Sequence, residues 1–261
     1  MDTILLVNLS LSFVLFATLW AVSVRVRDPS FIDAWWALGI VVLAWATFMQ
    51  APTPGPHALA LAGLATAWGL RLGLYLLRRW RDHGKDRRYD SLERAAAAQG
   101  LSFAAFSALW VFAPQMLLQF IVALPVMLGQ LSERGVYSAL AWWGTALAAF
   151  GVAYESIADW QLVRFKSKPA NVGKVMDRGL WRYSRHPNYF GDLCVWWGLW
   201  LIALDAGAGR FSLLGPTLLT LLLVGVSGAP TTEPHLKRTK PEYEAYKKRT
   251  SAFIPWPPRA D

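Results

Sequence analysis

Long apolar runs, separated by short polar and basic stretches, dominate the chain. An α-helix needs about 20 mostly apolar residues to cross about 30 Å of hydrocarbon. Seven runs approach or exceed that length, which predicts an all-α integral membrane protein with seven transmembrane helices. The expected spans are residues 3–24, 31–50, 58–78, 103–128, 136–158, 189–205 and 211–228.

The composition favours the same class. The 261 residues are 55% hydrophobic and include 15 tryptophans, whereas only 16% are charged. Ordinary soluble domains carry roughly 25% charged residues. We therefore expect one membrane domain over residues 1–261.

The distribution of basic residues predicts how the chain is oriented. Of the 26 lysines and arginines, 23 lie in four stretches that follow the first, third, fifth and seventh expected spans. These stretches all fall on one side of the membrane, which the positive-inside rule makes cytosolic. The N-terminus is then outside and the C-terminus cytosolic, and orientation and anionic membrane lipid explain the net charge of +9 without a nucleic-acid partner. The expected cytosolic parts are loops 79–102 and 159–188 and a tail over 229–261.

Several kinds of site are excluded by missing motifs. The single cysteine, Cys194, allows neither an internal disulfide nor a CxxC metal site, and the four histidines show no metal-ligand spacing. No G-x-G-x-x-G, P-loop or G-x-S-x-G sequence is present. We expect no metal, no Rossmann domain and no serine-hydrolase elbow.

Acidic residues near membrane depth are candidates for function, because such groups are costly there. In "GVAYESIADWQLVRFK", Glu155, Asp159 and Lys166 share one helix face. A helix over 136–166 would be roughly 46 Å long and would project beyond the bilayer. This face is either a solvated helix end or a grip for a polar ligand at the membrane edge.

The start of the second span, "DPSFIDAWW", allows two interpretations of Asp33. Ser30 and Asp33 fit an S-x-x-D capping box, which would give Asp33 a structural role. Alternatively, an acid against Trp35 and Trp36 tends to stay protonated and could donate a hydrogen bond to a carbonyl oxygen. In the fourth span, Gln115 shares a face with Gln119, which suits either contacts between helices or a pocket.

The stretch "RYSRHPNYFGD" places strong hydrogen-bonding groups at the start of the sixth span. Pro187 suits the first turn of a helix. Asn188 and Asp192 then lie one turn apart on the same face, near the positive end of the helix dipole. Capping the helix requires only one polar side chain, so the additional polar side chains of this stretch favour a bound ligand.

This stretch and the tail sequence "YEAYKKRTSAFIPW" resemble the steroid 5-alpha-reductase-like family of membrane reductases, most closely its bacterial branch. The resemblance covers most of residues 30–258. It implies a seven-helix fold, an NADPH cofactor bound from the cytosol, and a 3-oxo-5-alpha-steroid 4-dehydrogenase type of activity. Such an enzyme reduces the C4–C5 double bond of 3-oxo-4-ene steroids or a related enone lipid. The location implied is the bacterial inner membrane, with the active site reached from the cytosol.

The resemblance also implies roles for individual residues. Asp33 aligns with a catalytic glutamate, whereas the tyrosine that partners this glutamate in the family aligns with Trp68, which is no useful acid. Either Asp33 acts without that partner, or another tyrosine, for which Tyr89 is the candidate, substitutes. The steroid is expected to contact Trp35, Trp36, Trp68 and Gln115. The expected cofactor contacts are Asp86, Arg88, Glu155, Asp159, Lys166, Lys174, Tyr183, Arg185, His186, Asn188, Asp192, His235 and Tyr243.

Two other functions remain open from the sequence. R-H-P-x-Y-x-G with a C-terminal Y-x-x-Y also resembles the isoprenylcysteine and phospholipid methyltransferases, which use S-adenosylmethionine. The seven expected spans, "DWQL" and "DRRY" favour the reductase. A sterol-binding protein without turnover is the third interpretation.

Overall fold

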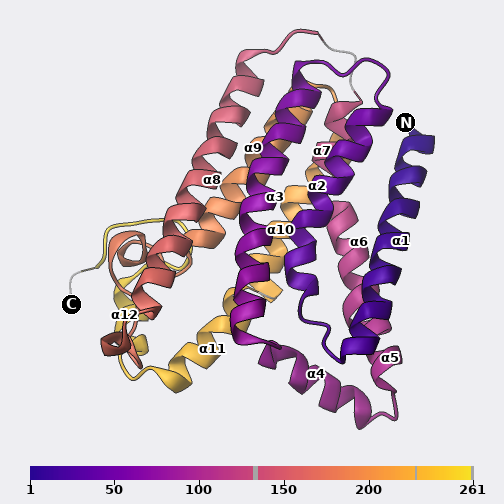
Figure 1. The fold of residues 1–261 in the computed structure, drawn as a ribbon. Helices are drawn as coiled ribbons and strands as arrows, with labels where there is room; N and C mark the ends of the chain where they lie inside the picture. The colour runs from indigo at the N-terminus through magenta and orange to yellow at the C-terminus, as the bar shows by residue number, and fades with distance from the viewer. Residues whose placement is uncertain (132–134, 227, 260–261) are drawn as a thin grey trace. The chain divides into compact units, whose positions relative to one another are not determined.

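A computed structural model describes residues 1–131, 135–226 and 228–259 (Figure 1). Within these ranges the chain is helical and has no named strand; Ser184 and Ser251 form an isolated bridge. The all-α prediction is therefore confirmed. Ser227 in the seventh expected span, Arg134 and the last two residues of the tail lie outside the described residues. The chain divides into two compact units, which we describe separately.

The first unit comprises residues 1–141 and 202–215. Three long helices come first, and the amphipathic segment after them forms a short helix. A π-helical turn over Ser107–Phe112 then joins two further helices. The helices are α1 (Asp2–Val26), α2 (Ile32–Gln50), α3 (Pro56–His83), α4 (Arg87–Ala97), α5 (Phe103–Phe106), α6 (Ala113–Val122) and α7 (Leu124–Gln130).

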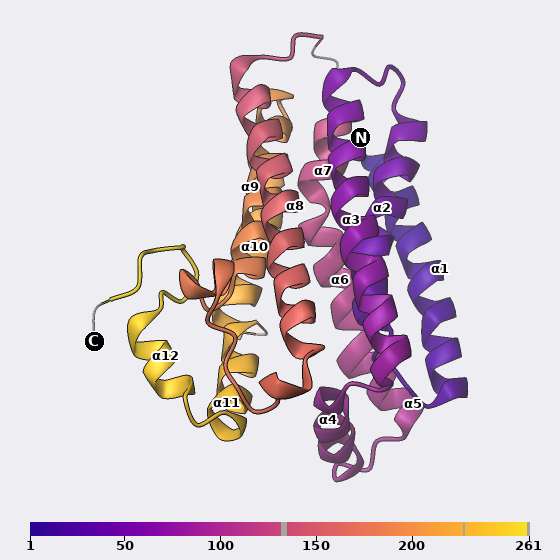
Figure 2. The ribbon, with the colours of Figure 1, turned by 60° about the vertical axis from the view of Figure 1, so that its left-hand side comes forward.

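The second unit comprises residues 142–201 and 216–261. Its two long helices, α8 (Ala139–Lys166) and α9 (Pro187–Asp205), run side by side in both views (Figures 1 and 2). The first three residues of α8 and the last four of α9 belong to the first unit. The two helices are followed by a helix that ends in a π-helical turn over Leu222–Val226 and by two short helices of the tail. These elements are α10 (Leu214–Leu221), α11 (Ala229–Thr239) and α12 (Tyr243–Arg249).

Among the described residues, five segments are long and apolar enough to cross a membrane, consistent with an integral membrane protein. They are Asp2–Val26, Ile32–Gln50, Pro56–His83, Phe103–Val122 and Arg210–Thr239. The helices at the fifth and sixth expected spans, α8 and α9, are not among the five. Both contain acidic residues and several tryptophans, which lower their mean hydropathy.

Glycines let helices approach closely within each unit. A Cβ on Gly69 of α3 would lie 2.8 Å from the carbonyl oxygen of Ala37 in α2. In the second unit, a Cβ on Gly151 of α8 would lie 2.6 Å from the carbonyl oxygen of Gly191 in α9. Such close contacts replace the hydrophobic driving force that is absent between helices in lipid.

An aromatic cluster fixes α4 to the rest of the first unit. Tyr89 and Ala96 of α4 are buried in it, 7% and 0% exposed. Asp86 caps α4 by accepting a hydrogen bond from the Arg88 backbone N–H at 2.9 Å. The cluster consists of Phe16, Ile32, Tyr89, Ala96, Phe103, Phe106, Val111 and Phe112.

The predicted capping box at the start of α2 is wrong. The helix begins at Ile32, and its N-terminus has no side-chain cap. Ser30 instead donates through its backbone N–H and its hydroxyl to Asp28 Oδ1, at 2.8 and 2.7 Å. Because Asp28 binds Ser30, Asp33 is left to contact other elements.

The packing of α8 against α9 can be tested with Gly151→Ala. The added methyl meets backbone rather than a movable side chain, so we expect the free energy of unfolding in detergent to fall by about 1–3 kcal/mol. Gly63→Ala in α3 is the control, since nothing lies within 4 Å of its Cβ position. Equal stability of the two variants in chemical denaturation would contradict the close contact.

Candidate functional site

Asp33 and α4 form a polar cluster at one end of the first unit. The Tyr89 hydroxyl donates to Asp33 Oδ1 at 2.7 Å, and Arg88 Nη2 donates to Oδ2, also at 2.7 Å. Both oxygens of Asp33 therefore accept hydrogen bonds, and one also pairs with a cation. The sequence suggested a protonated Asp33 that donates; the structure gives it the role of acceptor because Arg88 and Tyr89 reach it from α4.

Tyr89 is held in place from several sides. Its ring lies in the aromatic cluster, and Gln115 Nε2 donates to its hydroxyl oxygen at 3.2 Å. Burial, followed by the nearby charge of Asp33, raises the pKa of Tyr89 well above its ordinary value. The phenol therefore stays protonated at neutral pH and can act as a hydrogen-bond donor.

Arg88 joins two carboxylates. Its Nε lies 3.1 Å from each oxygen of Asp86, and its Nη2 bonds Asp86 as well as Asp33. Burial raises the pKa of Asp86, but hydrogen bonds from Arg88 outweigh this and lower it overall. Asp86 and Arg88 were both predicted to contact a cofactor, and here they neutralise each other.

The residues that were predicted to contact a steroid differ in how deeply they are buried. Trp68 is 1% exposed and packs inside the first unit, whereas Trp35 and Trp36 are partly buried. Gln119 Nε2 donates to the Trp36 carbonyl at 2.8 Å, so this glutamine joins α6 to α2. Among the described residues the indole N–H of Trp35 has no hydrogen-bond partner.

Three predicted cofactor residues in the second unit are buried carboxylates. Glu155, Asp159 and Asp192 are 3%, 6% and 7% exposed. The close approach of Gly191 to Glu155 brings the start of α9 against the face of α8 that carries the acids. Asn188 lies half-buried in the first turn of α9. Together they offer acceptors for hydroxyl and amide hydrogens.

Glu233 of α11 is a site residue that the sequence did not reveal. Its carboxylate accepts from Arg185 Nε at 2.9 Å, His186 Nε2 at 3.1 Å and Lys247 Nζ at 3.0 Å. No local motif connects these residues, since Glu233 is 47 positions from His186. No signal in the sequence set Glu233 apart from the other glutamates of this basic tail, Glu242 and Glu244.

His186 and Arg185 are committed to this internal network. The His186 ring stacks on Tyr189 and Phe253, with centroids 5.2 and 5.4 Å apart. Burial lowers the pKa of His186 more than its hydrogen bond to Glu233 raises it, so the ring is neutral at neutral pH. Arg185 Nη1 also donates to the Thr250 carbonyl at 2.7 Å.

The C-terminal tail covers the "RYSRHP" stretch. The Tyr246 hydroxyl donates to the Trp181 carbonyl at 2.5 Å, and the Trp256 N–H donates to the Tyr183 carbonyl at 3.0 Å. Tyr243 is 2% exposed, and burial raises its pKa to about 12. Other predicted cofactor residues have exposed side chains: Lys166, Lys174, Tyr183 and His235.

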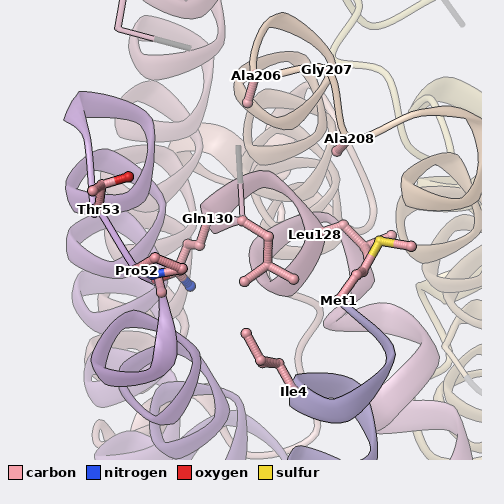
Figure 3. A pocket seen from close by; sticks show the side chains of 11 residues that line it. Met1, Ile4, Pro52, Thr53, Leu128, Gln130, Ala206, Gly207 and Ala208 are labelled. Atoms are coloured by element: carbon pink, nitrogen blue, oxygen red, sulfur yellow. The ribbon is translucent and has the colours of Figure 1, made fainter. Parts of the chain in front are cut away.

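A separate apolar cavity of about 400 Å³ lies at another part of the first unit (Figure 3). It is lined by Met1, Ile4 of α1, Pro52 and Thr53 after α2, the end of α7, and residues 206–208. None of the predicted site residues lines it. Nearby elements are tied together by Asp205, which accepts from Ser138 and lies 2.7 Å from His57 Nε2.

A family model described as "Protein of unknown function (DUF1295)" matches residues 19–250. The chain belongs to this family. The DUF1295 match includes Asp33, Tyr89, the acids of α8 and α9, and Glu233. An uncharacterized protein of Schizosaccharomyces pombe, C594.04c, is 26% identical over 279 residues, which cover 95% of this chain and 79% of the yeast protein. No solved structure matches the chain.

The Glu233 network can be tested with Glu233→Gln. Removing the carboxylate leaves Arg185 and Lys247 without their shared anion, so we expect unfolding to become easier by about 2–3 kcal/mol. Limited proteolysis should cut the tail faster.

Glu244→Gln is the matched control, because Glu244 pairs with Lys237 at the surface, where the side chains are 50% and 65% exposed. Its unfolding and its proteolysis should equal those of the wild type. Equal behaviour of both variants would show that Glu233 does not hold the tail.

Proposed function

We propose that this protein is a membrane reductase that uses NADPH to reduce the C4–C5 double bond of a 3-oxo-4-ene steroid or a related enone lipid. The observation that carries the proposal is the pair of hydrogen bonds at Tyr89, to Asp33 at 2.7 Å and from Gln115 at 3.2 Å. A buried, protonated phenol held by a carboxylate is suited to polarising a carbonyl oxygen. The sequence resemblance supplies the reaction class.

The proposal includes seven spans, with the N-terminus outside and the C-terminus in the cytosol. The five apolar segments are joined by α8 and α9. On α8, Trp142 and Trp143 are 64% and 72% exposed near one end, and Trp160 is 57% exposed near the other. At about 1.5 Å per residue, Trp142 and Trp160 lie about 27 Å apart, close to the thickness of the hydrocarbon core. Exposed tryptophans at that spacing are typical of both edges of a bilayer.

The chain's own residues would act on the carbonyl end of the enone. Tyr89 turns its hydroxyl hydrogen from Asp33 to the 3-keto oxygen and stabilises the negative charge that develops there. Gln115 holds the phenol oxygen, and Arg88 continues to neutralise Asp33 when the phenol turns. Solvent supplies the proton for the alpha carbon. Bound NADPH supplies the hydride for the beta carbon.

The second unit contains groups that fit parts of the cofactor. Asp159 and Asp192 are buried carboxylates that could accept hydrogen bonds from ribose hydroxyls, and the Asn188 amide can both donate and accept. S-adenosylmethionine also carries a ribose and amines, so these groups fit the methyltransferase alternative too. Arg185 and His186 are less suited, since both bind Glu233.

The role of Tyr89 can be tested with Tyr89→Phe. Loss of one donor to the developing oxyanion should lower kcat for testosterone by about 10²–10³-fold. The affinity for NADPH should stay the same, which separates this role from cofactor binding. Tyr154→Phe in α8 is the control and should keep full activity; its ring contacts Phe150 and Phe190. Normal turnover by Tyr89→Phe would remove Tyr89 from the mechanism.

The cofactor can be identified by thermal unfolding of the purified protein with NADPH, S-adenosylmethionine or a steroid. We expect NADPH to raise the unfolding midpoint, and Asp159→Asn and Asn188→Ala to weaken its binding about tenfold each. Stabilisation by S-adenosylmethionine alone would favour the methyltransferase. Stabilisation by steroid without NADPH consumption would indicate a sterol-binding protein.

A further inference from the structure

A second cavity, of about 610 Å³, lies in the second unit and is strongly basic. Four of its eight lining residues are arginines, and one, Asp177, is acidic. None of the four arginines belongs to the expected cofactor set or to the Glu233 network. The lining residues are Asp177, Arg178, Gly179, Arg182, Arg249, Thr250, Pro258 and Arg259.

The arginines are positioned by well-fixed backbone. A 3₁₀ turn runs over Gly179–Arg182, so Arg178 directly precedes it and Arg182 is its last residue. Its first residue, Gly179, has a φ of 58°, a left-handed conformation that favours glycine. The Leu180 N–H donates to Gln161 Oε1 at 2.9 Å, which holds this turn against α8. The other two arginines, Arg249 and Arg259, belong to the tail, and the Arg259 N–H donates to the Arg249 carbonyl at 2.9 Å.

Most of the positive charge in this cavity is available to a ligand. Arg249 pairs with Asp177 at 2.7 Å. Among residues 1–131, 135–226 and 228–259, no carboxylate forms an ion pair with Arg178, Arg182 or Arg259. All three have exposed side chains. Guanidinium groups match the geometry of a phosphate, and four arginines line this one space.

Apolar side chains beside the cavity indicate where the phosphate comes from. Ile254 and Trp256 are each 68% exposed and precede Arg259 in the tail. The bond from the Trp256 N–H to the Tyr183 carbonyl, at 3.0 Å, fixes them next to the start of α9. Tyr183 is itself 41% exposed. Exposed tryptophan, tyrosine and isoleucine beside arginines are typical of a surface that contacts the headgroup region of a bilayer.

We propose that this arginine cavity binds the phosphate of an anionic membrane phospholipid, whose acyl chains lie along Ile254 and Trp256. The lipid would hold the tail against the membrane surface. Because the tail covers the "RYSRHP" stretch, lipid binding would also stabilise that segment. The proposal needs neither the reductase activity nor NADPH.

Binding can be measured with a fluorescent short-chain phosphatidylglycerol in neutral detergent micelles, with phosphatidylcholine of the same chain length as the comparison. The wild type should prefer the anionic lipid. One basic group near an anionic lipid contributes about a fivefold change in affinity, so Arg182→Gln or Arg259→Gln should each weaken binding about fivefold and the double variant roughly 20-fold. Thermal unfolding in detergent should stay unchanged, because both side chains are exposed.

Lys248→Gln is the matched control. It removes the same charge from α12, next to Arg249, but Lys248 does not line the cavity. If Lys248→Gln weakens binding as much as the arginine variants do, the effect is a general electrostatic attraction between the basic protein and the anionic lipid, and the proposal is overturned. Equal affinity of the wild type for the two lipids would also overturn it. A third arm uses 2′,5′-ADP: if it binds with the same dependence on Arg182 and displaces the lipid, the cavity holds a soluble phosphate instead.

Discussion

Hydrocarbon offers no hydrogen-bonding partner, so an apolar segment that crosses it must satisfy its backbone internally. The described chain is accordingly helical, with five segments apolar enough to cross a membrane. The same constraint gathers polar side chains at helix ends and in connecting segments. Asp33 lies in the first turn of α2, and Asn188 and Asp192 lie in the first two turns of α9. The Asp33 site therefore lies at the start of α2, and the Asn188 and Asp192 site lies at the start of α9.

Short helices complete these sites. In the first unit α4 carries both Tyr89 and Arg88 to Asp33, and the aromatic cluster around Phe103 and Phe106 holds α4 in place. In the second unit α11 and α12 supply Glu233 and Tyr246 to the stretch before α9. In each case one carboxylate binds several donors from a distant segment, which orders a connection that would otherwise be a solvated loop.

The prediction at Asp33 shows the limit of local patterns. Ser30 and Asp33 have the spacing of a capping box, but Asp28, two residues before Ser30, binds that hydroxyl at 2.7 Å. Asp33 was also expected to donate a hydrogen bond, and it accepts two because Arg88 and Tyr89 are 55 and 56 positions away in sequence and adjacent in space. The sequence-based choice of Tyr89 as the partner of Asp33 agrees with the structure in one respect, since the two side chains are hydrogen-bonded. The role of that pair in a reaction stays a prediction.

The sequence alone determined the helical class, the approximate helix positions and the start of α9 at Pro187, because apolar length and proline geometry are local properties. It also identified the acidic face of α8, since residues four apart share a helix face. The tertiary structure decided which groups bind one another. It assigned Arg185 and His186 to Glu233, buried Trp68 and made Asp33 an acceptor. These outcomes depend on contacts between segments that no period or spacing encodes, so only the folded chain could decide them.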